Sequence, residues 1–219
     1  MAMRNSFEGP SGYTGGVFED ELLGGIMCGW DNKRYIEARK SKDWDTANKL
    51  VSDWIKKNLS EESLTQWGRS NGEGRKRLLM DWARKNQPED WKPEEPLFVK
   101  IDNDKVTKKN VWGSNLHTMV AEHLGIAVED YKALKLYTTA QTPVDTLYGV
   151  DGFFEFEGTV FTVDVTLNPN KESPGADFVL LLEDPGNQDE LREKTAILTS
   201  RFEEAIERQQ EEAARRQVA

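Results

Sequence analysis

The stretch that most constrains the fold is GVDGFFEFEGTVFTVDVTLNPNK, residues 149–171, in which two extended apolar runs flank a Glu157-Gly158 turn. β-branched and aromatic residues in such runs are typical of strands, and a Gly between two such runs is typical of a turn. The segment therefore predicts a β-hairpin. Asp151 begins its first strand and Asp164 lies near the end of its second, at similar distances from the turn, so the two should lie close together.

The second predicted strand carries a polar stripe, because Thr162, Asp164 and Thr166 fall on one face when side chains alternate. An ionised acid in an apolar strand is costly unless something compensates it. Two interpretations stay open. The aspartates are ordinary strand-start and solvent-facing residues, or they form a site in which a cation lies between two carboxylates.

The rest of the chain predicts an α+β fold with four parts: a flexible Gly-rich arm over 1–30, a helical Trp-rich region over 31–95, a mixed-sheet core over 96–186 and a long amphipathic C-terminal helix over 187–219. Apolar spacings of three and four predict helices over 44–57, 74–85, 113–124 (capped by Ser114) and 188–216, and a short helix from Ser60 to before Gly68. Further strands are expected in 97–102, 134–140 and 177–183. The three prolines of QPEDWKPEEP predict a linker between the second and third parts.

Charge is distributed unevenly around a net value of −10. Residues 1–110 hold 20 basic and 19 acidic side chains (+1), and residues 111–219 hold 9 and 20 (−11). This balance argues against a protein that coats nucleic acid by bulk charge, but it leaves local contact open. The candidate contacts are Arg75, Lys76, Arg77, Lys108 and Lys109, and the alternative is that they form solvated surface.

Several classes of site are not predicted. The single cysteine, Cys28, excludes an internal disulfide, and His117 and His123 are six residues apart, so they do not share a helix face for zinc. No phosphate-binding loop, esterase, zinc-protease or kinase motif occurs. No apolar run is long enough for a membrane span and the opening residues lack a signal-peptide pattern, which favours a cytoplasmic location, either in a host cell or, for a phage-encoded chain, also in the virion.

Over about residues 112–183 the chain resembles the PD-(D/E)XK nuclease superfamily. Both have a helix that carries an acid, followed by a β-meander with Asp at the start of one strand and an acid on the next strand. The resemblance implies a restriction-endonuclease-like core that binds Mg²⁺ or Mn²⁺. Its metal ligands match Asp151 and Asp164, and the acid that many members carry on the first helix matches Glu122. The family's lysine position holds Thr166, so the resemblance leaves Lys171, five residues on, as the candidate for that role.

Two functions are therefore expected as alternatives. One is a divalent-metal-dependent nuclease that hydrolyses phosphodiester bonds of DNA. The other is a catalytically inactive nuclease fold that serves as a phage structural, assembly or inhibitory binding module, with the C-terminal helix binding a protein partner or a second copy.

Overall fold

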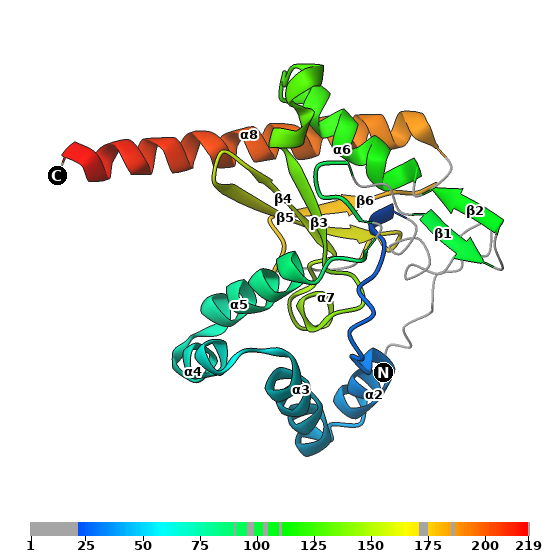
Figure 1. Cartoon of the computed structure of the whole chain (residues 1–219), viewed down its shortest axis with the longest axis vertical. Coiled ribbons are helices and arrows are strands. Elements are labelled where there is room, and N and C mark those ends of the chain that lie inside the picture. The colour runs from blue at the N-terminus through cyan, green and yellow to red at the C-terminus, as the bar shows by residue number, and fades with distance from the viewer. Residues whose placement is uncertain are drawn as a thin grey trace.

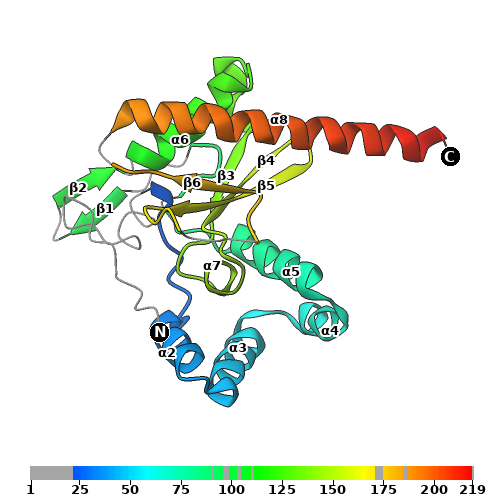
Figure 2. The same ribbon diagram turned by 180° about the vertical axis from the view of Figure 1, so that it is seen from behind.

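The computed structural model describes residues 22–218, except residues 90, 96–98, 103–104, 110, 171–174 and 185–186. Within that part of the chain, a four-stranded mixed sheet lies between two layers of helices (Figures 1 and 2). One face is covered by α6 (Val111–His123) and α8 (Gln188–Val218), and the other by α5 (Gly72–Lys85) and α7 (Pro143–Tyr148). The predicted α+β class with a long C-terminal helix is confirmed.

The sheet contains β3 (Lys135–Thr138), β4 (Gly152–Phe156), β5 (Thr159–Thr166) and β6 (Phe178–Leu181), in that spatial order. The first three strands form an antiparallel meander, and β6 runs parallel to β5. The predicted hairpin is therefore confirmed. Glu157 and Gly158 both have positive φ, 51° and 79°, as a two-residue turn that matches the strand twist requires.

The N-terminal helices α2 (Asn32–Lys40), α3 (Trp44–Asn58), α4 (Glu61–Arg69) and α5 follow one another in an arc beside the sheet (Figure 1). Each begins at a polar side chain that accepts a backbone N–H of the first turn, and Ser60 does so for α4 as predicted. Trp54 of α3 and Leu79 of α5 share an apolar cluster with Phe153 of β4. The helical region and the sheet are thus joined by a common core.

Two sequence expectations for the flanks of this region were wrong. Leu22 and Leu23, assigned to the flexible arm, are fully buried in the main core. The expected linker instead covers the edge of the sheet: the Gln87 side chain bonds both the N–H and the C=O of Thr138, and the Trp91 indole donates to the Leu136 carbonyl at 2.9 Å. These contacts satisfy backbone groups that an edge strand would otherwise expose.

Three differences concern element boundaries. A separate two-stranded sheet pairs β1 (Val99–Asp102) with β2 (Lys105–Lys109), and only its first strand was predicted. Helix α6 begins at Val111, so Ser114 lies inside it and does not cap it. Helix α7 was not predicted, and it fills the stretch between the expected strand over 134–140 and the hairpin, because Thr142 caps a helix that has Pro143 at its first position.

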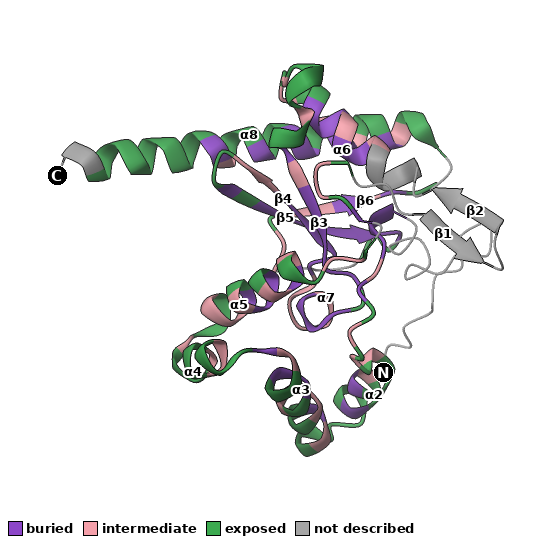
Figure 3. Ribbon diagram, viewed as in Figure 1, coloured by how far each residue is buried: buried purple, intermediate pink, exposed green. Residues whose placement is uncertain are grey.

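Helix α8 has two halves. Leu191, Leu198 and Phe202, on the predicted apolar face, are fully buried against the sheet. Residues 207–216 are all exposed, and this half extends beyond the sheet (Figure 3). Among the described helices, none has the length and apolar character that crossing a bilayer requires.

Candidate functional site

The two aspartates of the hairpin lie opposite each other. The β4–β5 register pairs Gly152 with Val163, so the next residues outward on each strand are Asp151 and Asp164. Cβ atoms of directly opposed residues are about 5 Å apart. Both side chains are fully buried. The proximity that the sequence predicted is therefore observed.

Three hydrogen bonds to neighbouring strands hold Asp151 in place. Its N–H donates to the Val163 carbonyl at 2.9 Å, and its carbonyl accepts from the Thr139 N–H at 2.8 Å. Its Oδ2 accepts from the Val165 N–H at 2.7 Å. Because β5 extends past the start of β4, Val165 has no strand partner on that side, and the carboxylate supplies the acceptor. Asp151 thus has a structural role whatever else it does.

The chain reaches Asp151 through a left-handed residue. Gly149, with φ 63°, ends α7 and donates its N–H to the Asp145 carbonyl at 2.7 Å. This conformation costs glycine little because it has no Cβ. The turn redirects the chain from the helix into β4 and so sets where the carboxylate begins the strand.

The aspartates face the α5–α7 layer. Phe153, which packs with Trp54 and Leu79 in that layer, is opposite Thr162 in the register. By alternation Asp151 shares the face of Phe153, and Asp164 shares the face of Thr162. Two buried carboxylates on one face repel each other unless a proton or a cation lies between them.

The two other predicted catalytic residues do not join this pair in the described structure. Glu122 is exposed on α6, whose buried residues pack on the opposite face of the sheet, so the expectation that it assists the aspartates is wrong. Lys171 lies outside the described residues. Thr166, at the family's lysine position, is buried, and its hydroxyl accepts from the Asn168 N–H at 3.1 Å.

The donor chemistry of the pair fits a hard divalent cation, because Mg²⁺ and Mn²⁺ bind carboxylate oxygens. Among the described residues, no group of three or more His, Cys, Asp and Glu side chains is placed to hold a metal. Within the described part of the chain, an ion at Asp151 and Asp164 would therefore have these two carboxylates as its His, Cys, Asp or Glu ligands.

An open groove with a volume of about 2440 Å³ lies on the same side of the sheet as the aspartates. Its walls come from α2, α5 and α7 and from the distal α8 segment, residues 205–216. The hairpin turn, Thr162 and the loop around Asp177 form its floor. Thr162 precedes Asp164 by two residues, so the groove comes within about 7 Å of Asp164 along the strand.

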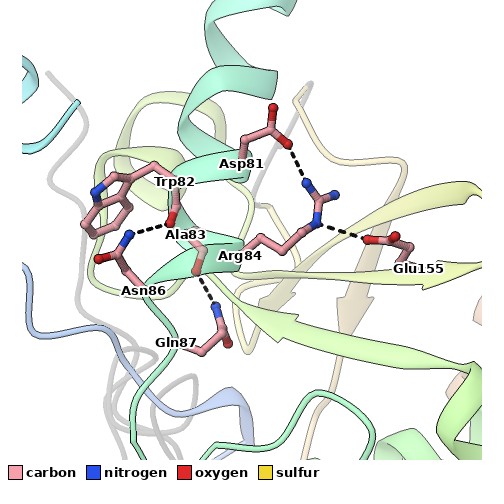
Figure 4. Close-up of polar contacts among 7 residues, drawn as sticks. All are labelled: Asp81, Trp82, Ala83, Arg84, Asn86, Gln87 and Glu155. Carbon is pink, nitrogen blue, oxygen red and sulfur yellow. Dashed lines mark hydrogen bonds and ion pairs between the residues drawn. The ribbon is translucent and has the colours of Figure 1, made fainter. Parts of the chain in front are cut away.

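The groove has a local surplus of positive charge. Among the residues that the structure describes, seven cationic and five acidic side chains line it. Three pairs neutralise each other: Arg77 with Glu73, Arg84 with Asp81 (Figure 4), and Arg216 with Glu212. Arg84 also contacts Glu155 of β4 at 3.0 Å, which ties α5 to the sheet.

Three of the remaining cations, Arg39, Lys40 and Arg208, form no ion pair with any carboxylate in the described part of the chain. The fourth is Lys76, and two acids remain beside them, Asp145 and Asp177. The described lining of the groove therefore carries two more cations than acids, in a protein whose net charge is −10.

The basic residues singled out from the sequence have different placements. Lys76 is buried and donates its Nζ to the Gly175 carbonyl, while Arg75 donates to the Trp67 carbonyl and stacks on that ring at 5.3 Å. Arg77 is exposed and pairs with Glu73 at 3.7 Å. Lys108 and Lys109 lie in β2, where only the backbone is described.

Sequence reasoning missed the groove residues because they come from separate helices. One signal was available in α8: Ala205, Arg208, Gln209, Glu212, Ala213 and Arg216 recur at spacings of three and one, which places them on a single helix face.

Comparison with protein-family models, with curated protein sequences and with solved structures finds no significant match.

Proposed function

We propose that this chain is a divalent-metal-dependent nuclease that hydrolyses phosphodiester bonds of DNA, with Asp151 and Asp164 as its metal ligands. The observation that carries the proposal is the placement of two fully buried carboxylates opposite each other, on the side of the sheet that bears a groove. Burial of two like charges at adjacent positions is costly, and a bound cation is one means of offsetting that cost.

The order of elements supports the proposal. Helix α6, the meander of β3, β4 and β5, and then β6 follow the order of helix, meander and fourth strand in the PD-(D/E)XK superfamily. The chain departs from that family between β5 and β6, where the described residues of the connection form no helix. A family-like core is therefore part of the proposal.

The chain's own residues supply orientation in this proposal. The Val165 N–H fixes Asp151 Oδ2 at 2.7 Å, so the carboxylate keeps one orientation. A bound Mg²⁺ or Mn²⁺ supplies acidity to water and stabilises charge on the phosphodiester. Lys171 remains the proposed source of positive charge near the scissile phosphate, since Thr166 cannot carry one. Glu122 has no role here, because it lies on the other side of the sheet.

The test compares Asp151→Asn and Asp164→Asn with wild type on supercoiled plasmid, single-stranded DNA and RNA, in Mg²⁺, Mn²⁺ or EDTA. We expect metal-dependent cleavage that each substitution lowers by at least about 100-fold, as the loss of a ligand to an essential ion should. Glu122→Gln and Asp130→Asn, both exposed positions, are matched controls that should cleave normally.

Calorimetric titration of the same proteins with Mn²⁺ alone gives a second readout. The wild type should bind the ion, and the two aspartate variants should not. Cleavage that persists in both variants, or equal Mn²⁺ binding in all of them, would overturn the assignment of the metal ligands.

A second function has an observation in its favour. Thr166 at the lysine position is buried and hydrogen-bonded, and residues 207–216 of α8 are exposed, as suits a nuclease fold that acts only as an assembly or inhibitory module. This alternative predicts no cleavage, no Mn²⁺ binding and a defined oligomer or complex. Light scattering coupled to size-exclusion chromatography measures the last of these.

A further inference from the structure

The groove contains an aromatic and cationic pair that neither the core nor the aspartate site uses. Arg39, near the end of α2, lies over the Trp44 ring with its guanidinium carbon 4.6 Å from the ring centroid. The same carbon is 5.9 Å from the Tyr35 ring, and Nη1 donates to the Tyr35 hydroxyl at 3.3 Å. Trp44 is 49% exposed, which is unusual for so large an apolar side chain in this protein.

Cations that form no ion pair with any described carboxylate lie on both walls of the groove. Arg39 and Lys40 extend from α2, and Arg208 extends from the distal α8 segment. Lys40 and Arg39 also occupy the last turn of α2, where positive charge stabilises a helix. That role does not account for Arg208, which is more than 160 residues away in the sequence and lines the same groove from the opposite wall.

We infer that this groove binds single-stranded nucleic acid, with phosphates on Arg39, Lys40 and Arg208 and a base stacked on Trp44. The choice of nucleic acid over other polyanions rests on the proposed function. Proteins that hold single strands combine cations that follow the backbone with aromatic side chains on which bases stack.

A single strand fits these features better than a duplex. Bases in a duplex are stacked on each other and cannot reach a half-exposed tryptophan. The surplus of two cations is also small, and duplex binding depends mainly on many phosphate contacts. Stacking on Trp44 therefore has to provide part of the affinity.

The experiment measures fluorescence anisotropy of a labelled mixed-sequence strand of about 20 nucleotides, in EDTA so that no metal-dependent cleavage occurs. The same strand annealed to its complement, and labelled polyglutamate, are titrated in parallel. We expect the wild type to bind the single strand at least about tenfold more tightly than the duplex, and not to bind polyglutamate.

Variants locate the binding. Trp44→Ala and Arg39→Ala should each raise the dissociation constant for the single strand roughly tenfold, and Trp44→Phe should retain most of the affinity. Arg208→Ala should lower the slope of log affinity against log salt by about 0.7, as loss of one phosphate contact to a single strand does. The controls are Arg34→Ala on α2 and Arg215→Ala on α8, neither of which lines the groove. Circular dichroism verifies that each variant is folded.

The inference is overturned if the wild type binds no single strand, if it binds duplex or polyglutamate equally well, or if the groove variants bind like their controls. If the protein binds single strands in EDTA but cleaves no substrate, the inference about the groove stands and the proposal of a nuclease fails. If cleavage is unchanged in Trp44→Ala and Arg39→Ala, the proposal of a nuclease stands and the inference about the groove fails. The two proposals therefore fail separately.

Discussion

The two faces of the sheet are built differently, although the same strands supply both. Toward α6 and α8, β5 presents Phe161, Val163 and Val165, which join a continuous apolar cluster. Toward α5 and α7, the same strand presents Thr162, Asp164 and Thr166, all buried. The first face is a hydrophobic core of ordinary composition. The second buries polar groups that need hydrogen bonds or charge compensation.

The apolar face contributes mainly to the stability of the fold, and the polar face is the candidate for function. The apolar face stabilises the protein by removing surface from water, and its residues are interchangeable with others of similar shape. The polar face contributes less net stability for the same buried area, because each polar group loses its hydration. The groove reaches this polar face at Thr162, which makes the face the candidate for function.

The largest effect should come from the apolar face. Phe202 of α8 is fully buried and stacks on Phe161 with ring centroids 5.1 Å apart. Phe202→Ala should lower the free energy of unfolding by about 3–5 kcal/mol, because it removes packed surface and leaves a cavity. Urea denaturation followed by circular dichroism measures this. The control, Ile197→Ala, lies on the same helix at 47% exposure and should cost less than about 1 kcal/mol.

If Phe202→Ala cost no more than its control, the α6–α8 face would not be the main source of stability. The contrast between the faces would then have no energetic basis.

A smaller effect should come from Asp151 on the polar face. Asp151→Ala leaves the buried Val165 N–H without its acceptor and should cost about 1–3 kcal/mol. Asp151→Asn keeps a carbonyl oxygen that can accept the same bond, so its cost should be below about 1 kcal/mol. Thermal and urea unfolding in EDTA compare the two variants.

Equal costs for the two variants would show that the charge of Asp151, and not its hydrogen bond, contributes to stability. If neither variant changes the stability, Asp151 has no structural role and its carboxylate serves function only.

The smallest effect concerns pH and again lies on the apolar face. Burial lowers the pKa of His117 below its ordinary value of 6.5, partly offset by its bond to the Leu134 carbonyl and by Glu94 and Glu95. The folded state therefore favours the neutral imidazole. Its contribution to stability is complete above about pH 6.5 and is lost as pH falls through the lowered pKa, by at most about 1.4 kcal/mol per pH unit.

Unfolding of wild type and His117→Gln between about pH 7.5 and pH 5 measures this contribution, since one proton sets the slope. The variant should lack the part of the acid destabilisation that His117 causes. His123→Gln, at an exposed position on α6, should follow the wild type. If the free energy of unfolding of His117→Gln falls with pH as steeply as that of the wild type, other groups cause the acid sensitivity.

Local patterns in the sequence were reliable guides to local structure. Alternation and the Glu157-Gly158 turn predicted the hairpin and brought Asp151 opposite Asp164, because register in a two-residue hairpin follows from the turn. Ser60 capped α4 as expected, and the apolar positions of α8 are those that are buried. Each of these depends on residues close together in the chain.

The expectations that failed depended on contacts between distant segments. Glu122 was predicted to join the aspartates, but helical periodicity does not say which face of a sheet the helix covers. Trp91 was placed in a linker because of nearby prolines, yet it packs in the core and bonds Leu136, 45 residues away. The Gly-rich composition near Leu22 likewise concealed a buried segment.

By itself the sequence determined most of the elements: the hairpin and its turn, most of the helices, and the side chains of those elements that avoid water. These follow from backbone sterics and hydrophobic periodicity, which act over a few residues. Only the tertiary structure decided that Asp151 and Asp164 share their side of the sheet with a groove, and that Arg39 and Arg208 stand on its opposite walls. Hydrophobic periodicity shows that a face must be buried. Which element buries it depends on how helices far apart in the chain pack together.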